Sequence, residues 1–283
     1  MHISNKNTTF ASMKEQINYI ISQLQGFYPV EELRELAYWI VEETTGMTRT
    51  QILMENHVGT SIPNIEKIIK RLQAQEPIQY IFGHTEWMGL DLHVNSATLI
   101  PRPETAELVE WVIEKLDNNV SLRVMDIGTG SGCIAIALKK RCPQWRLIGV
   151  DVSEEALEVA RENAKINGVE VDWRKNDILL ETPESVDIIV SNPPYICHQE
   201  KAAMDRRVLD YEPHRALYVP DDDPLLFYRR IASIKLSRML FFEINEAYGE
   251  QVCEMMRQLG YEDVQIKFDI YGKARMVFGR IKV

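Results

Sequence analysis

Four consecutive residues, Asn192-Pro193-Pro194-Tyr195, follow an apolar run at 186–190 that the sequence predicts to be a buried strand. The Asn192 side chain and the backbone carbonyls of both prolines are hydrogen-bond acceptors, and proline contributes no backbone N–H. This corner can therefore accept both hydrogens of a planar NH2 group, while the Tyr195 ring packs on the flat face of the group that carries it. A rigid turn without chemical function is the alternative.

An NH2 group held in this way is a candidate acceptor for a methyl group. The lone pair of an amide nitrogen is delocalised into the carbonyl, so the nitrogen is a poor nucleophile. Acceptors on both hydrogens favour a more pyramidal nitrogen and offset the positive charge that develops on it. A methyl group on a sulfonium is already activated, so the reaction needs orientation rather than a metal or a strong base. We predict Asn192, Pro193 and Tyr195 as catalytic residues, and Pro194 with them as part of the substrate site.

A glycine-rich segment, Asp-Ile-Gly-Thr-Gly-Ser-Gly at Asp126–Gly132, lies between a predicted strand and a predicted helix. Glycine is required where the backbone turns sharply and a ligand approaches closely, and the start of a helix favours an anionic group. A dinucleotide site needs Gly-x-Gly-x-x-Gly, but Cys133 stands where its third glycine would be. The pattern resembles instead the first motif of Rossmann-like methyltransferases, with a tight turn as the alternative. It predicts an S-adenosylmethionine site at Gly128, Thr129, Gly130, Ser131 and Gly132.

Acidic residues follow two further predicted strands. Asp151 comes after the strand predicted at 146–150, where a carboxylate can accept both hydrogen bonds of a ribose diol. Capping of the next helix is its alternative role. Asp177 follows a third predicted strand and is expected to meet the adenine amino group, with Ile178 against the ring, unless it is a solvated turn residue. Asn192, which must aim the substrate nitrogen at the methyl group, is expected to border the cofactor as well.

The order of patterns along the chain predicts the fold. Helical and strand patterns alternate from residue 105 onward, which indicates a parallel sheet covered by helices on both faces. Apolar residues recur at helical spacing before residue 77, and glycines with alternating apolar residues then indicate a hairpin. The expected class is α/β: a Rossmann-like class I methyltransferase domain at 100–283, a small N-terminal helical bundle domain at 1–76 and a β-hairpin joint at 77–99.

Composition limits the class of protein further. The chain has 283 residues and a net charge of −10. We expect a cytoplasmic protein, because no apolar run reaches about 18 residues and the N-terminus lacks a signal-peptide core. Proteins held on nucleic acid by phosphate attraction are basic in at least one domain, so direct nucleic-acid binding is not expected. The four cysteines form no Cys-x-x-Cys pair, which favours buried thiols over a metal site, although adjacent Cys197 and His198 could in principle bind a metal.

Taken together, these motifs resemble those of one family, the peptide chain release factor glutamine methyltransferases, also called the PrmC or HemK family. The resemblance covers nearly the whole chain, and Ile-Pro-Arg-Pro-Glu-Thr together with Asn-Pro-Pro-Tyr is its most specific combination. Besides the glycine loop, Asp151 and the 192–195 corner, the segments that carry it are Pro77–Gly83, Glu86-Trp87, Gly89-Leu90, Leu99–Thr105 and Asp269–Arg275.

The resemblance implies an activity and a partner. The methyl group would pass from S-adenosylmethionine to the side-chain amide nitrogen, N5, of the glutamine in the Gly-Gly-Gln motif of release factors, and so modulate translation termination. Asn192 and the carbonyl of Pro193 would hold the glutamine amide, and the turn at 101–105 would help line the cofactor side of the cleft. The N-terminal helical domain would dock the release factor. We expect a monomer without a metal.

Departures and rival functions remain beside this interpretation. The family often shows Glu-Ile-Gly followed by Gln where this chain has Glu243–Tyr248, and glycines are missing from Pro220–Pro224. A ribosomal-protein glutamine methyltransferase would share the same motifs, but the segment 101–104 resembles the release-factor branch. A DNA or RNA adenine N6-methyltransferase uses the same corner on a flipped base. A catalytically silent binding module is the fourth possibility.

Overall fold

The N-terminal part of the chain is a bundle of short helices. The structure, a computed structural model, describes residues 12–54, 62–116 and 120–281, and it divides into two compact units, Met1–Phe82 and Gly83–Val283. The extreme N-terminus, where no signal-peptide core is expected, lies outside the described residues. The helices of the first unit are α1 (Met13–Leu24), α2 (Val30–Thr45), α3 (Arg49–Met54), α4 (Ile65–Gln73) and α5 (Ile78–Phe82).

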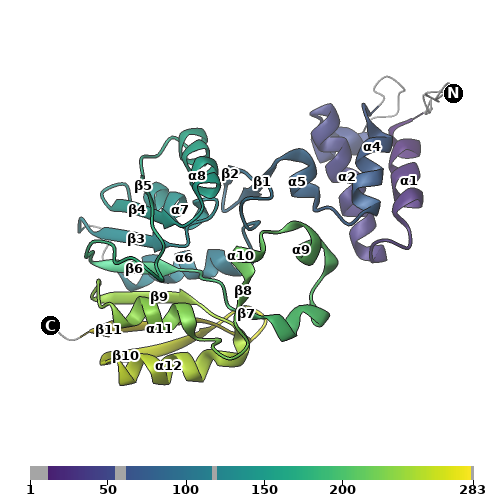
Figure 1. The fold of residues 1–283 in the computed structure, drawn as a ribbon. Helices are drawn as coiled ribbons and strands as arrows, with labels where there is room; N and C mark the ends of the chain where they lie inside the picture. The colour runs from purple at the N-terminus through teal and green to yellow at the C-terminus, as the bar shows by residue number, and fades with distance from the viewer. Residues whose placement is uncertain (1–11, 55–61, 117–119, 282–283) are drawn as a thin grey trace. The chain divides into compact units, whose positions relative to one another are not determined.

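Capping and apolar spacing explain the first two helices. Ser12 Oγ accepts a hydrogen bond from the Glu15 amide at 3.2 Å. Helix α2 ends at Gly46, whose φ of 69° is a left-handed conformation that glycine adopts at little cost. Ile17 and Ile20 stand three residues apart on α1 and are buried in a core shared with α2 and α4, which contact α1 (Figure 1). The shared core, rather than the propensity of any single helix, stabilises this unit.

The second unit opens with a β-hairpin. Strands β1 (His84–Trp87) and β2 (Leu90–His93) pair in antiparallel register. The two residues between them, Met88 and Gly89, have φ of 51° and 71°, which suits a two-residue hairpin turn. The hairpin begins only at β1, because Ile78 and its neighbours form α5 and Ile78 is buried in the core of the helical unit.

Asn163 ties this hairpin to the rest of the second unit. It lies fully buried on α8 (Glu154–Ile166). Its side-chain oxygen accepts from the His93 amide at 2.6 Å, and its NH2 group donates to the carbonyls of His93 and Ser131, each at 2.9 Å. One buried amide therefore joins the second strand of the hairpin to the glycine loop.

A seven-stranded sheet forms the centre of the second unit. The strand order is β10-β11-β9-β6-β3-β4-β5. The five strands from β9 to β5 in this order pair in parallel, whereas β10 and β11 form an antiparallel edge (Figure 1). The strands are β3 (Arg123–Ile127), β4 (Arg146–Asp151), β5 (Asp172–Lys175), β6 (Ile188–Ser191), β9 (Met239–Glu243), β10 (Tyr261–Phe268) and β11 (Ala274–Ile281).

Helices cover both faces of this sheet. Alternate residues of a strand point to opposite faces, and in the central strands β3, β6 and β9 both sets are mostly apolar and buried. Val124 and Ile188 pack in one core with α6 (Pro103–Lys115) and α7 (Cys133–Arg141). On the opposite face, residues such as Met125 pack with α11 (Leu226–Ser233) and α12 (Gly249–Gln258) (Figure 1). The remaining elements are β7 (Ile196–Cys197), η1 (His198–Ala203), α9 (Arg206–Tyr211), α10 (His214–Leu217), β8 (Tyr218–Val219) and η2 (Glu246–Tyr248).

This arrangement confirms the expected fold class. An α/β sheet of Rossmann type, a small helical bundle and a hairpin are all present. In the ranges that the structure describes, no helix combines the length and the apolar character needed to cross a membrane.

Trp173 on β5 makes two glycines necessary. A Cβ atom built on Gly149 would lie 2.2 Å from the Trp173 ring, and one built on Gly132 would lie 2.8 Å from it. Real Cβ atoms do not approach other heavy atoms so closely, because interiors are close-packed. The indole therefore packs directly on the backbone of β4 and on the last glycine of the loop, and it supports both.

We expect Gly149→Ala to lower the free energy of unfolding by about 1–3 kcal/mol, because the added methyl group must displace the Trp173 ring. Urea unfolding of the wild type and the variant measures the difference. Combining Gly149→Ala with Trp173→Leu should recover part of the loss, since the smaller side chain leaves room. Equal stability of the wild type and Gly149→Ala would contradict this account.

Candidate active site

The segments predicted to bind ligands meet at one edge of the sheet. Gly128 follows β3, Asp151 ends β4, Asp177 comes two residues after β5, and Asn192 follows β6. These strands are parallel neighbours, so their carboxyl ends lie at the same edge. Strand β3 lies between β4 and β6, where the chain order reverses, and open α/β sheets bind ligands at such a point.

The glycine loop turns through three left-handed residues. Gly128, Gly130 and Gly132 have φ of 73°, 54° and 81°, a region in which other residues are strained. The amides of Gly128 and Thr129 both donate to the Val150 carbonyl, at 2.9 and 3.0 Å. The loop therefore bends over the end of β4 and leads into α7, for which Gly132 is the N-cap.

A hydrogen bond between two buried side chains, Thr129 and Asp126, stabilises the loop. The Thr129 hydroxyl donates to Asp126 Oδ2 at 2.5 Å, and Asp126 is fully buried at the end of β3. Burial raises the pKa of this carboxyl to about 7. Thr129 and Ser131 are themselves buried, so any contact that they make with a ligand runs mainly through their backbone. The sequence did not single out Asp126 as a site residue, and it supports the loop rather than lining it.

Asp151 lies beside the loop rather than at the start of the next helix. Its Oδ2 accepts from the Gly130 amide and its Oδ1 from the Ser153 amide, each at 2.9 Å. The N-cap of α8 is Ser153, whose hydroxyl accepts from the Ala156 amide at 3.2 Å. Each carboxylate oxygen has a second lone pair for a diol. Burial raises the pKa of Asp151, and the backbone N–H donors oppose that rise.

The contacts of Asp177 and Ile178 are mostly local. Asp177 Oδ1 accepts from the Leu179 amide at 3.0 Å, which stabilises a turn. Ile178 is buried in the core beside α11, and its carbonyl accepts from Arg230 Nε at 2.8 Å. These are the contacts of a turn residue and a core residue, and the adenine contact remains a prediction for both.

The corner at 192–195 is held by a partly buried chain of hydrogen bonds. Asn192 Nδ2 donates to Thr105 Oγ1 at 3.4 Å, and the Thr105 hydroxyl donates to Glu243 Oε2 at 2.7 Å. Tyr195 donates its phenolic proton to Glu243 Oε1 at 3.2 Å. A Cβ atom built on Gly128 would lie 3.9 Å from the Asn192 backbone oxygen. The corner and the glycine loop are therefore neighbours, as methyl transfer requires.

The turn that leads into α6 is fixed from two sides, and it positions Thr105 in the first turn of the helix. Arg102 forms an ion pair of 2.5 Å with the buried Glu212, which also accepts from the Ile100 amide at 3.4 Å. Trp87 of the hairpin donates its indole N–H to the Arg102 carbonyl at 2.8 Å. The turn at 101–105, expected to line the cleft, thus brings the Thr105 hydroxyl to the corner.

The departure at Asn245 is accommodated by specific partners. Its Nδ2 donates to the Tyr195 carbonyl and to both Glu200 oxygens, each at 3.2 Å, and its Oδ1 accepts from the Ala247 amide at 3.0 Å. A side chain stands here where the family often has glycine, and it is buried with every polar atom bonded. This departure therefore braces the backbone of the corner.

Sequence reasoning assigned no site role to Glu243 or Glu212, and it placed Thr105 only within the turn expected to line the cleft. Two signals were available: a threonine that closes the Pro-Arg-Pro-Glu-Thr segment, and an acidic residue at the end of the apolar strand β9. Neither signal shows that the two side chains meet.

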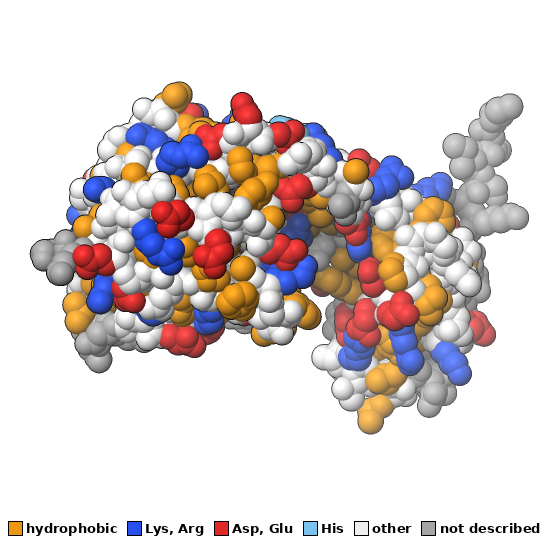
Figure 2. Space-filling model, turned by 90° about the horizontal axis from the view of Figure 1, so that it is seen from below, with side chains coloured by type: hydrophobic (Ala, Val, Ile, Leu, Met, Phe, Trp, Pro, Cys, Tyr) orange, Lys and Arg blue, Asp and Glu red, His pale blue; other side chains and the backbone are white. Residues whose placement is uncertain are grey.

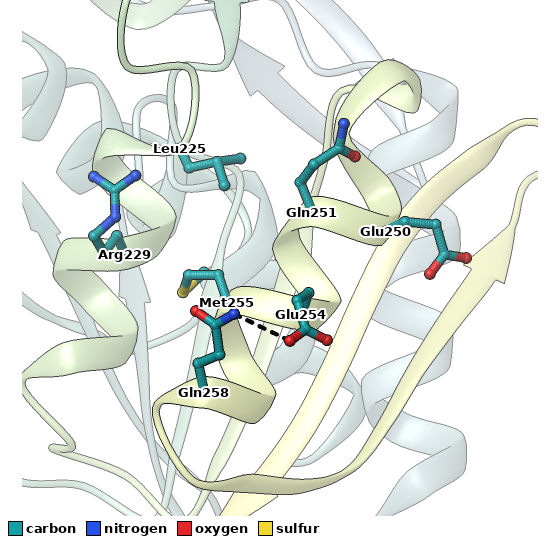
Figure 3. Close-up of a pocket in the computed structure, with 7 residues that line it drawn as sticks. All are labelled: Leu225, Arg229, Glu250, Gln251, Glu254, Met255 and Gln258. Atoms are coloured by element: carbon teal, nitrogen blue, oxygen red, sulfur yellow. Dashed lines mark hydrogen bonds between the residues drawn. The ribbon is translucent and has the colours of Figure 1, made fainter.

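Two further features are the cysteines and a surface hollow. All four thiols are free and buried, Cys197 Sγ lies 3.5 Å from the Tyr248 hydroxyl, and the His198 ring stacks on Tyr218. Across the described ranges, no three His, Cys, Asp or Glu side chains are grouped as metal ligands. A hollow between α11 and α12, bordered by Glu254 and Gln258, shares no residue with the predicted site (Figure 3).

Comparison with known proteins decides the family. Models of the PrmC N-terminal domain and of the methyltransferase small domain match residues 15–83 and 108–210. A release factor glutamine methyltransferase of Bacteroides thetaiotaomicron is 44% identical over 270 residues, 92% of this chain and 96% of that protein. One of Flavobacterium psychrophilum is 38% identical over 280 residues, 94% and 98% of the two chains. The chain belongs to the release factor glutamine methyltransferase family.

Membership in the release factor glutamine methyltransferase family confirms the enzyme class and the S-adenosylmethionine cofactor expected from the motifs. Solved structures share the fold: the human methyltransferase 10 domain containing protein has a TM-score of 0.52 at 20% identity, covering 68% of this chain and 90% of that one. A methyltransferase from Pyrococcus furiosus has a TM-score of 0.51 at 18% identity, covering 78% and 99%.

We expect Asp126→Asn to change how stability depends on pH. The folded pKa of about 7 lies above that of an unfolded aspartate, so the folded state binds the proton more tightly. The stability linked to this proton is fully present below the unfolded pKa and is lost as pH rises through about 7. The melting temperature of Asp126→Asn should therefore rise relative to that of the wild type from about pH 5 to about pH 8. A difference that stays constant would show that Asp126 does not titrate in this range.

Proposed function

We propose that this chain transfers a methyl group from S-adenosylmethionine to the side-chain amide nitrogen, N5, of the glutamine in the Gly-Gly-Gln motif of peptide chain release factors. One observation carries the proposal. The NH2 end of Asn192 is turned to Thr105, so its carbonyl oxygen is left as an acceptor beside the prolines and next to the glycine loop. The names of the relatives, which are release factor glutamine methyltransferases, supply the substrate.

The chemistry follows from the acceptors of the corner. The carbonyls of Asn192 and Pro193 accept the two hydrogens of the glutamine amide, which localises its lone pair and offsets the developing positive charge. The Tyr195 ring packs against the flat carboxamide. Bound S-adenosylmethionine supplies an electrophilic methyl group on a sulfonium. The substrate nitrogen would gain the methyl group as the sulfonium loses it, and its extra proton would pass to water.

The residues of the cofactor site fit the group that they are proposed to hold. The glycines of the loop give close access to the backbone, and the start of α7 favours anionic groups. Asp151 would bind the ribose diol with the lone pairs that its two backbone donors leave over. Asp177 and Ile178 complete the proposed site on the adenine side, and Asn192 borders it on the methyl side.

The proposal assigns the helical unit a role in substrate docking. The match to the PrmC N-terminal domain supports this, because it covers the helical unit almost entirely. The chain would act as a monomer in the cytoplasm, where release factors work. Acidic and basic side chains are interspersed on the face in Figure 2, and the net charge is −10, so we do not propose a nucleic-acid substrate.

The substrate assignment predicts the outcome of a direct assay. We expect labelled methyl groups to pass to a purified release factor, and mass spectrometry of its Gly-Gly-Gln peptide to show one added methyl group on the glutamine. Ribosomes and DNA, incubated in parallel, serve as the controls for the two rival substrates. Label in ribosomal protein or in DNA, with none in the release factor, would replace the proposed substrate by a rival.

Two substitutions should separate chemistry from cofactor binding. Asn192→Ala removes an acceptor for the reacting NH2 group, so we expect kcat to fall about 100- to 1000-fold, while cofactor affinity falls much less than in Asp151→Ala because Asn192 only borders the methyl end. Asp151→Ala removes the acceptor proposed for the ribose, so the cofactor Kd should rise at least tenfold, by about 1.4 kcal/mol. Isothermal titration calorimetry and single-turnover transfer measure the two effects. Normal cofactor affinity in Asp151→Ala would remove the ribose assignment.

A further inference from the structure

Glu243 is a buried carboxylate in the second unit to which no role has yet been given. It ends β9 and is 1% exposed. Each of its oxygens accepts one hydroxyl proton, from Thr105 at 2.7 Å and from Tyr195 at 3.2 Å. Those two hydroxyls belong to residues that contact, or form part of, the 192–195 corner. Glu243 therefore reaches both ends of the corner without being part of it.

We propose that Glu243 is a positioning residue for methyl transfer, which acts through Thr105 to fix the orientation of the Asn192 amide and through Tyr195 to fix the aromatic ring. This role rests on the proposed function, since it concerns the same corner. It adds Glu243, which the motifs did not indicate, and it gives a specific contact to Thr105, which was expected only as part of the turn that lines the cleft.

The orientation of Asn192 follows from the single proton of the Thr105 hydroxyl. Because Thr105 gives that proton to Glu243, its oxygen remains only an acceptor toward Asn192. An NH2 group can satisfy this acceptor and a carbonyl oxygen cannot. The observed contact, from Asn192 Nδ2 to Thr105 Oγ1 at 3.4 Å, is the one that this logic requires. The Asn192 carbonyl is then directed away from Thr105 and is available to a substrate.

The other oxygen of Glu243 acts on the far end of the corner. The Tyr195 hydroxyl is fixed by Glu243, while the Tyr195 carbonyl accepts from Asn245 at 3.2 Å. Ring and backbone are thus held independently. A residue that stacks on a planar substrate loses less conformational freedom on binding when its ring is already fixed.

A carboxylate suits this role better than a neutral side chain. Only an ionised carboxylate accepts two hydroxyl protons on different oxygens without offering a donor. The groups that face it are Arg275 on β11, Glu104 and Thr105 on α6, Tyr195 at the corner, the Cys133 thiol on α7 and the Tyr228 hydroxyl on α11. Arg275 is shared with Asp269, which lies 3.2 Å from its Nε atom, so it compensates Glu243 only in part. Burying such a charge costs stability, as expected for a residue retained for function.

If Glu243 has this role, its protonation state should make the rate of methyl transfer depend on pH. Burial raises its pKa to about 7. Above this pH both oxygens accept, and below it one oxygen carries a proton and competes with the hydroxyl that it should receive. The single-turnover rate should therefore fall as pH drops through about 7. Replacing Glu243 should remove this dependence, because no proton is then bound at that position.

The test uses the full-length enzyme, S-adenosylmethionine and a Gly-Gly-Gln peptide. We expect Glu243→Gln and Thr105→Val each to slow single-turnover transfer about 100-fold, because both release the Asn192 amide. The conservative variant Thr105→Ser keeps the hydroxyl and should stay within about threefold of the wild type. Combining the two disruptive substitutions should cost little more than either one, since they break the same chain of hydrogen bonds.

Three further readouts separate positioning from a structural role. Glu254→Gln is the matched control, since Glu254 is exposed on α12 and pairs with Arg257 at the surface, and it should leave the rate unchanged. Cofactor affinity by calorimetry should be the same in all variants. The melting temperature of Glu243→Gln should rise relative to the wild type as pH increases through about 7, because a buried carboxyl with a raised pKa destabilises the fold above that pH.

Distinct outcomes overturn the inference and the proposed function. A wild-type rate in Thr105→Val, fully additive losses in the double variant, or an unchanged pH profile in Glu243→Gln would each remove the positioning role and leave the substrate intact. A wild-type enzyme that transfers no methyl group to the peptide or to the release factor would overturn the proposed function, and this role with it.

Discussion

Parallel pairing of the central strands is the constraint on which the rest of the structure depends. Strands β4, β3, β6 and β9 run side by side in one direction, so that everything that follows them emerges at one edge. Because both faces of the sheet are covered by helices, that edge is where polar groups can gather. Gly128, Asp151, Asn192 and Glu243 are brought together by this geometry alone, although they span more than a hundred positions in the chain.

The site is built from supports as much as from ligand-binding groups. Asp126 holds the glycine loop through Thr129, and Glu243 holds the corner through Thr105 and Tyr195. Both carboxyls are buried, and their pKa values are raised to about 7 by loss of hydration. Two buried acids at a sheet edge weaken the fold near neutral pH. They also fix the hydroxyls around them, which gives the neighbouring backbone and amide a defined orientation.

Local signals made much of this predictable. The 128–132 loop and the 192–195 corner are short segments whose residue types indicate their backbone conformation and the hydrogen-bonding groups that they offer. Asp151 could be predicted from its position at the end of a strand. Contacts between distant residues gave no such signal. Thr105 and Glu243 are 138 positions apart, and the amide of Asn163 meets His93 and Ser131 only in the folded chain. A residue that acts only through a contact with a distant residue leaves no local sequence pattern, whereas a motif is visible in consecutive residues.

The bond network of Asn163 also marks where the chain can be divided. The Asn163 side chain joins the second hairpin strand to the glycine loop, so the hairpin is part of the second unit. The boundary between the two units therefore lies before the hairpin, between Phe82 and Gly83. Recombination that replaced the N-terminal helical unit by another domain would need only one junction, between Phe82 and Gly83. The predicted site, together with the residues that hold it in place, would be kept intact in the second unit.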